Sequence, residues 1–220
     1  MFTEFESSIQ GGFCSVVRSY TKLNNKYLSD YDPNKPKSSA LFLDVNSLYA
    51  TVLHGKLPTG DFYELTSSEI EMFDYENVDL DGDYCYALSI DFEIPDDVKV
   101  QTDDFPMSIK NDVIQYEQLS EYTKNIMKEV GIKNEKHSSL IASHEPREKY
   151  LISLKLLRLF LTLGMKCLKV HKVYGFKQEA MFKSYIEKNI KLRTNSTGVN
   201  KKATYKMMSN CIYGKGALQC

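Results

Sequence analysis

Asp44 is a carboxylate that stands between two segments of opposite character. Before it, residues 39–43 are small or apolar and predict a buried strand. After it, Asn46 and Ser47 are typical of helix N-caps, and residues 48–53 predict the start of a helix. A carboxylate at a strand end that faces a helix start can bind a divalent cation beside amides that suit phosphate. The simpler alternative is a strand–turn–helix in which Asp44 only caps the turn.

A second set of polar side chains lies near the end of the chain, at helical spacing. In a helix with about 100° per residue, Lys206, Asn210 and Tyr213 fall within roughly 60° of one another. Lys202 extends this stripe by one turn, and Gly214 stands where a C-terminal cap is expected. The opposite side, which we expect to pack on a core, carries Met207, Met208, Cys211 and Ile212. Such a stripe suits a polar ligand, and the alternative is an ordinary solvated helix face.

Together the two segments resemble motifs A and B of family B DNA polymerases. Residues 44–49 are similar to D-x-x-S-L-Y-P, and residues 206–214 are similar to K-x-x-x-N-S-x-Y-G. Ala50 and Cys211 stand where these motifs have Pro and Ser. The likeness is to the protein-primed branch, in particular polymerases of Polinton/Maverick elements and related large DNA viruses. Shorter runs extend it from about Ile9 to Lys215: residues 10–12, 24–27, 30–33, 57–60, 163–166 and 176–178.

The resemblance implies a role for each residue around motif A. Asp44 would be one of two catalytic carboxylates that bridge two Mg²⁺ ions, and the carbonyl of Val45 would be a further metal ligand. Backbone amides near Leu48 and Tyr49 would bind phosphate oxygens of the dNTP. The ring of Tyr49 would lie under the sugar and exclude a 2′-hydroxyl.

The resemblance also assigns roles around motif B. Arg193 and Lys206 correspond to the cations that bind the triphosphate, and Asn210 and Tyr213 would border the nascent base pair. The residues expected to contact template DNA are Gly11, Gly12, Lys202 and Gly214. The implied substrates are therefore dNTPs and a DNA primer–template.

The predicted fold class is α+β: a polymerase palm-type antiparallel sheet with an α/β insertion and fingers helices, as an incomplete domain. We expect a linker and template-side lead-in over 1–37 and palm motif A over 38–61. An insertion similar to a terminal-protein region, with part of the palm, would span 62–165. Residues 166–220 would supply a palm strand and the fingers helices with motif B.

Periodicity predicts the remaining elements. Alternation of apolar residues predicts a strand over 84–94, and residues 167–176 predict another. Helices are predicted over 112–130 and 181–191, and a helix or mixed segment is predicted over 146–163, with Gly164 as the stop signal. Residues 1–37 and 134–145 are predicted to be irregular, and residues 57–60 are predicted to end the strand–turn–helix segment.

Charge is divided unevenly along the chain. Residues 61–104 carry 15 Asp and Glu against Lys99 alone, whereas residues 146–220 carry 16 Lys and Arg against 3 Glu. The basic third predicts a surface that contacts phosphate. The acidic block would repel DNA, so we expect it to bind a protein with a basic surface, such as a terminal protein. The acidic run 79–83 breaks EF-hand spacing and is typical of a hairpin turn.

Several classes of protein are disfavoured. The five cysteines lack CxxC spacing, which argues against a zinc site or a disulfide framework. No apolar run is long enough to span a membrane and the N-terminus lacks a basic signal region, so we expect no membrane partner and an intracellular chain, in the nucleus or at a viral replication site.

Two parts of a complete polymerase have no counterpart in these residues. No Asp follows Asp112, so the D-T-D core of motif C is missing, and no D-x-E exonuclease motif precedes Asp44. We therefore expect part of a DNA-directed DNA polymerase that is inactive alone. The alternative is a non-catalytic nucleotide- and nucleic-acid-binding protein derived from a polymerase.

Overall fold

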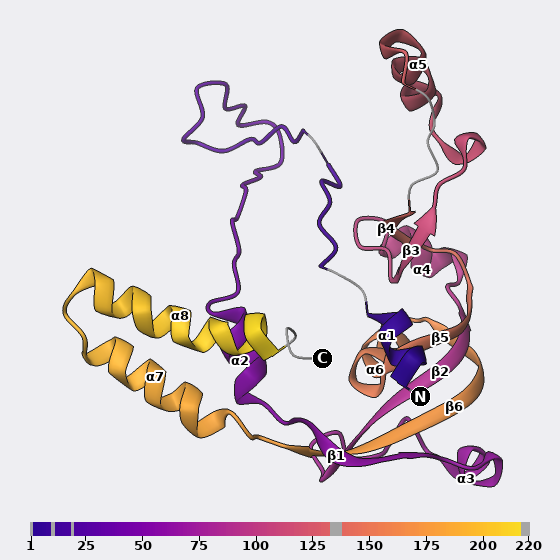
Figure 1. Ribbon diagram of the computed structural model, residues 1–220. Helices are drawn as coiled ribbons and strands as arrows, with labels where there is room; N and C mark the ends of the chain where they lie inside the picture. Colours follow the sequence, from indigo (N-terminus) through magenta and orange to yellow (C-terminus); the bar gives the residue numbers. More distant parts are fainter. Residues whose placement is uncertain (1, 10–11, 19, 133–137, 217–220) are drawn as a thin grey trace. The chain divides into compact units, whose positions relative to one another are not determined.

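The computed structural model describes residues 2–9, 12–18, 20–132 and 138–216 (Figure 1). The predicted α+β class is confirmed, with antiparallel pairing of β2 with β5 and of β3 with β4. The elements are α1 (Phe2–Ser8), α2 (Leu48–His54), β1 (Leu57–Glu64), α3 (Ser67–Met72), β2 (Tyr84–Glu93), α4 (Asp96–Gln101), β3 (Ser108–Val113), η1 (Tyr116–Gln118), α5 (Glu121–Val130), β4 (Ser138–Ser143), β5 (Arg147–Ser153), α6 (Leu154–Thr162), β6 (Lys166–Glu179), α7 (Lys183–Asn195) and α8 (Val199–Gly216).

The chain divides into two compact units. The first unit contains Met1–Val17, Tyr63–Leu80 and Tyr86–Gly175, and the second contains Arg18–Phe62, Asp81–Cys85 and Phe176–Cys220. A four-stranded sheet has the order β1-β6-β2-β5, and β1, β2 and β6 each contribute residues to both units.

The first unit has the main hydrophobic core, in which α6 packs on the sheet. Its fully buried residues include Leu88, Ile90 and Phe92 of β2, Leu157 of α6 and Val173 of β6. Burying such side chains stabilises the unit by about 1.5–3 kcal/mol each. The alternation that predicted a strand over 84–94 arises because this face of β2 is buried.

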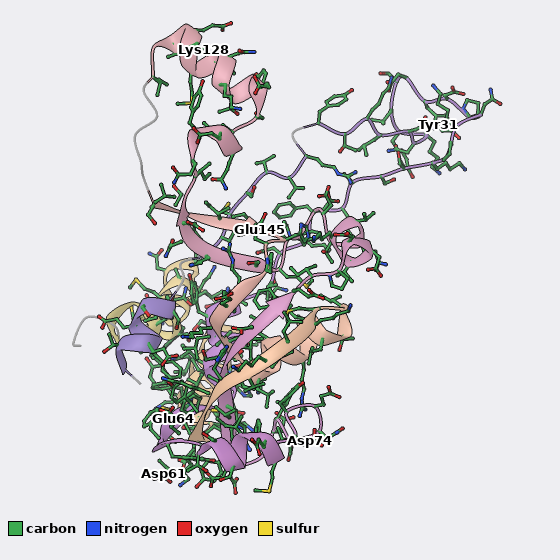
Figure 2. All side chains as sticks on the ribbon, turned by 90° about the vertical axis from the view of Figure 1, so that its right-hand side faces the viewer. Tyr31, Asp61, Glu64, Asp74, Lys128 and Glu145 are labelled. Atoms are coloured by element: carbon green, nitrogen blue, oxygen red, sulfur yellow. The ribbon has the colours of Figure 1, made fainter. Side chains whose placement is uncertain are left out.

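A hairpin extends the first unit. β3 pairs antiparallel with β4, from Ser108 opposite Ser143 to Val113 opposite Ser138. The side chain of Arg147 joins the hairpin to β5, because its Nε donates to the Ser108 hydroxyl at 2.7 Å. Helix α5 follows β3 and η1, and Figure 2 shows its side chains, including that of Lys128, projecting away from the ribbon.

In the second unit, α7 and α8 run side by side and α2 contacts both (Figure 1). A small core joins them, in which Ala50 and Leu53 of α2 pack with Ile186 of α7. The partly buried residues around this core are Leu57, Phe182 and Ile212. The core fixes the turn before α2 relative to α7.

The strand predicted over 39–43 is wrong. These residues are irregular and exposed, and the side chains of Leu41, Phe42 and Leu43 are 79%, 92% and 79% exposed. A strand needs a neighbour for its backbone hydrogen bonds, and no segment in the described part of the chain forms a ladder with these residues. Residues 57–60, predicted to end the strand–turn–helix segment, do follow the end of α2 at His54, and they begin β1.

Several predictions in the first unit are wrong as well. The helix predicted over 112–130 is a strand end, the short η1 and then α5, which starts only where the hydroxyl of Ser120 accepts from the Thr123 N–H. Part of the loop predicted over 134–145 is β4. The helix or mixed segment predicted over 146–163 is mixed, since β5 is followed directly by α6. Residues 2–8, predicted to be irregular, form α1. These segments pair or pack through contacts distant in sequence, which override local pattern.

The predicted packing side of the motif B helix needs correction. Met207 and Met208 are 61% and 39% exposed and Cys211 is exposed, so of the predicted core side only Ile212 packs. The buried face instead centres on Ser209, which is 5% exposed. Gly214 does not end the helix, because α8 continues to Gly216.

A candidate phosphate-binding site between three helices

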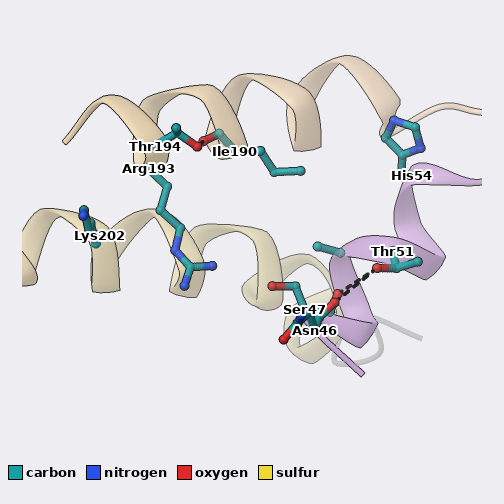
Figure 3. A pocket seen from close by; sticks show the side chains of 9 residues that line it. Asn46, Ser47, Thr51, His54, Ile190, Arg193, Thr194 and Lys202 are labelled. Atoms are coloured by element: carbon teal, nitrogen blue, oxygen red, sulfur yellow. Dashed lines mark hydrogen bonds between the residues drawn. The ribbon is translucent and has the colours of Figure 1, made fainter. Parts of the chain in front are cut away.

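In the second unit, a pocket of about 640 Å³ lies between α2, α7 and α8. Figure 3 shows Asn46 and Ser47 on one side of it and the side chain of Arg193, which extends from α7 toward α8 and α2. The other residues that line it are Ala50, Thr51, His54, Ile190, Thr194 and Lys202. The pocket therefore brings the turn after Asp44 beside two cations of the basic third.

A smaller pocket of about 20 Å³ shares Ser47 and Arg193 with the first. Its other lining residues are Ala50, Asn189, Ile190, Tyr205, Lys206, Ser209 and Asn210. Three of the residues predicted to contact the nucleotide, Arg193, Lys206 and Asn210, thus line one cavity with Ser47. Lys206 and Asn210 also line a third pocket of about 400 Å³, with Met207 and Cys211.

The charge around the two pockets has one sign. They are lined by Arg193, Lys202 and Lys206, and no Asp or Glu is among the residues that line them in the described chain. Residues 183–216 carry eight Lys and Arg against Glu187 alone, and this carboxylate lies 3.2 Å from His54. Within the described residues, none of the three lining cations has an ion-pair partner. Unpaired cations in one cavity suit an anionic ligand.

The start of α2 has an unusual backbone that presents this turn to the pocket. Ser47 adopts a left-handed conformation, with φ 53°, and its side chain makes no capping hydrogen bond. The hydroxyl of Thr51 instead donates to the carbonyl of Ser47 at 3.3 Å (Figure 3). Ser47 therefore occupies the predicted N-cap position, but its side chain does not cap the helix, and its hydroxyl is available to a bound molecule.

Two tyrosines predicted to contact the nucleotide lie against each other. The ring centroids of Tyr49 on α2 and Tyr213 on α8 are 4.7 Å apart, with an interplanar angle of 33°. Both side chains are about half exposed or more, at 47% and 63%. Leu48, whose backbone amide was predicted to bind phosphate, is the first residue of α2.

Asp44 and Val45 lie in the exposed irregular segment before α2, and neither lines these pockets. No group of three or more His, Cys, Asp or Glu in the described chain is placed to bind a metal ion. Asp44 and the Val45 carbonyl can supply two oxygen ligands of the kind Mg²⁺ prefers. They do not complete a two-metal site among the described residues.

The residues predicted to contact template DNA belong to different parts of the chain. Lys202 lines the large pocket, and Gly214 is in the last turns of α8. Gly12 belongs to the first unit, in an exposed irregular segment, and Gly11 lies outside the described residues.

Several residues that line the site were not predicted from the sequence, namely Asn189, Thr194 and Ser209. Ser47 was predicted as an N-cap and not as a residue that could contact a bound molecule. Asn189 had a detectable signal, because it precedes Arg193 by four residues and so lies on the same helix face. The signal for Ser209 was hidden by its larger apolar neighbours Met207 and Met208.

The fold and the pocket define an α+β protein with a cationic, carboxylate-free cavity that suits polyphosphate. The family model described as DNA polymerase type B, organellar and viral, matches residues 1–220. The chain belongs to this family of type B DNA polymerases.

Solved structures similar to this chain include phi29 DNA polymerase in an orthorhombic crystal form, at 20% identity and a TM-score of 0.49, covering 98% of this chain. They also include phi29 DNA polymerase with primer–template DNA, at 24% identity, a TM-score of 0.43 and 78% coverage. Its ternary complex with incoming nucleotides has 22% identity, a TM-score of 0.40 and the same coverage. The chain spans 31% of the length of the chain in the orthorhombic crystal form, 24% in the complex with primer–template DNA and 25% in the ternary complex.

A comparison with curated protein sequences gave no match. Among the described residues, none of the helices combines the length and the apolar character that crossing a membrane requires.

Proposed function

We propose that this chain forms the nucleotide-binding part of a DNA-directed DNA polymerase that transfers nucleotides from dNTPs during protein-primed replication. The observation that carries the proposal is the two pockets between α2, α7 and α8, which share lining residues and together are lined by three cations, with no carboxylate among their described lining residues. The triphosphate would lie against Arg193 and Lys206. Membership of the type B polymerase family supports this assignment.

The base and sugar of the dNTP would lie toward the contacting rings of Tyr49 and Tyr213, with Asn210 beside them. The backbone of Leu48 and Tyr49 would meet phosphate oxygens. Asp44 and the Val45 carbonyl would bind Mg²⁺ that accompanies the triphosphate, and the metal would neutralise charge at the reacting phosphate.

Nucleotide binding by the 220-residue chain tests the proposal. We expect Arg193→Ala and Lys206→Ala each to weaken binding of dATP by roughly tenfold or more, because each removes a charged hydrogen-bond donor. Lys201→Ala is the matched control, since this exposed lysine neighbours Lys202 but lines none of the described pockets. Equal affinity in all four proteins, at constant salt, would contradict the proposal.

We expect the 220 residues alone not to extend a primer with Mg²⁺ and dNTPs. Two-metal catalysis needs carboxylates that hold two ions about 4 Å apart, and no group of three or more His, Cys, Asp or Glu in the described chain is placed to hold a metal ion. The same observation favours the alternative, a non-catalytic binding protein. Adding the downstream polymerase region in trans distinguishes them: synthesis that Asp44→Asn abolishes identifies the polymerase, and no synthesis identifies the binding protein.

We further propose that the insertion, residues 62–165, binds a terminal protein and that DNA contacts the Lys202 side of α8. The acidic block of residues 61–104 disfavours DNA as its partner. The hairpin β3–β4 with α5 gives this insertion an extended surface. Reversing charges in α3 by Glu69→Lys and Glu71→Lys should weaken capture of a basic terminal protein without changing dATP affinity. Retention of duplex DNA by the insertion at moderate salt would refute this assignment.

A further inference from the structure

Asn189 is buried in the wall of the small pocket without a use in the fold. The residue is 3% exposed, and its amide Nδ2 has no hydrogen-bond partner in the described chain. A buried amide donor left unpaired costs about 1–3 kcal/mol, so such groups are rare in folded proteins. The unpaired amide donor of Asn189 therefore indicates that it donates to a group outside the described chain.

The surroundings of this amide identify the chemistry of its partner. Asn189 lines the same cavity as Arg193 and Lys206, whose side chains can only donate hydrogen bonds. The hydroxyl of Ser209, also in this wall, is directed to the carbonyl of Tyr205 at 3.4 Å. A cavity lined by two cations and an unpaired amide donor suits an acceptor with negative charge, and its volume of about 20 Å³ admits one oxygen-sized atom.

We propose that the Asn189 amide donates a hydrogen bond to a phosphate oxygen that enters this cavity between Arg193 and Lys206. The inference rests on the proposed function and adds a binding residue that neither the motifs nor their spacing assigned. The phosphate could belong to the triphosphate of a nucleotide or to the backbone of DNA. The two sources share this chemistry, and the experiment separates them.

The test uses Asn189→Leu in the 220-residue chain, because leucine keeps the volume of the side chain and removes the donor. If the amide serves only a ligand, the free protein should keep or gain thermal stability, since an unpaired buried donor has been removed. Binding of tripolyphosphate, followed by NMR titration, should weaken by roughly tenfold or more, the usual effect of losing a hydrogen bond to a charged group. A structural asparagine would instead lower stability and leave affinity unchanged.

Three comparisons make the outcome decisive. Asn195→Ala, at the exposed end of α7, should change neither quantity. Asn189→Asp keeps the shape of the amide and replaces its donor with a carboxylate, so it should also weaken binding, and it supports the test if the leucine variant fails to fold. Weaker binding of tripolyphosphate and dATP assigns the phosphate to a nucleotide, whereas weaker binding only of a short oligothymidine assigns it to DNA.

The result that would overturn the inference is unchanged tripolyphosphate, dATP and oligothymidine affinity in folded Asn189→Leu and Asn189→Asp. If Arg193→Ala still weakened binding in that case, the proposed function would stand and only the role of Asn189 would fall. If wild-type protein bound none of the three ligands, both would fall.

Discussion

Ile186 of α7 should control whether the pocket forms, although it does not line it. Its side chain is fully buried in the small core, where it contacts α2 through Ala50 and Leu53. Ile186→Ala would remove most of the side chain that joins α7 to α2. The turn at Asn46 and Ser47 would then lose its fixed position relative to Arg193.

The size of the effect follows from the burial. Truncation of Ile186 to alanine removes three carbon atoms, which is worth about 2.4 kcal/mol at about 0.8 kcal/mol each. The cavity left behind adds to this cost, so we expect a loss of about 3 kcal/mol. Ile186→Val removes one carbon and should cost about 1 kcal/mol.

Hydrogen exchange of the backbone amides of α2 and α7 measures this loss locally. A decrease of about 3 kcal/mol in the free energy of opening should accelerate exchange by roughly a hundredfold, and the valine variant by roughly fivefold. Leu192→Ala is the surface control on α7, since this side chain is 37% exposed. Exchange in α2 that changes less than about threefold in Ile186→Ala would refute the idea that this core positions the turn.

Two further predictions concern the first unit. A Cβ on Gly175 would clash with the outer ring atoms of Tyr63, a side chain that is 40% exposed and can move aside, so Gly175→Ala should lower the free energy of unfolding by about 1 kcal/mol. In a Tyr63→Ala background the substitution should cost less, and equal effects in both backgrounds of a double-mutant cycle would contradict the steric explanation. The carboxylate of Asp91 accepts a hydrogen bond from the backbone N–H of Lys149, and the Nε2 of His171 lies 2.7 Å from its Oδ1. These two contacts hold the pKa of Asp91 below its usual value of 3.8. Because the folded pKa is the lower one, Asp91 stabilises the fold above about pH 4 and loses that contribution as the pH falls further, so urea denaturation at pH 7, 5 and 3 should show the deficit of Asp91→Asn shrinking at the lowest pH.

Periodicity predicted those elements whose own residues determine their structure. The strand around Leu88 and Ile90 alternates because its large apolar side chains enter the core on one face, while the small Ala87 and Ser89 are buried on the other. The helix that carries Lys206 was predicted from the spacing of its polar residues. Strands β3, β4 and β5 were missed because they are short and polar, and register with a distant partner decides their structure. The strand predicted around Leu41 was wrong for the opposite reason: apolar residues alone do not form a strand when no neighbouring strand pairs with them.

The candidate site was predictable only where a residue type had a clear chemical use. Lys206 and Asn210 follow from helical spacing, and Arg193 follows from the resemblance to polymerase motifs. Which side of α8 packs could not be read from hydrophobicity, because the helix contacts α7 through the small Ser209 and leaves Met207 exposed. Asn189 could be placed on the face of Arg193, but its unpaired donor is a property of packing.

The proposed phosphate site and the proposed metal ligands of this chain have different physical supports. The lining residues come from α2, α7 and α8, which are joined by the buried side chains of Leu53 and Ile186. Asp44 lies outside these helices, in an exposed segment that lacks a ladder partner among the described residues. The pocket can therefore keep its cations in place whatever the position of Asp44. The proposed metal binding by Asp44 also requires that residues 39–45 be held in one position. We therefore expect phosphate binding to survive perturbations that abolish metal binding.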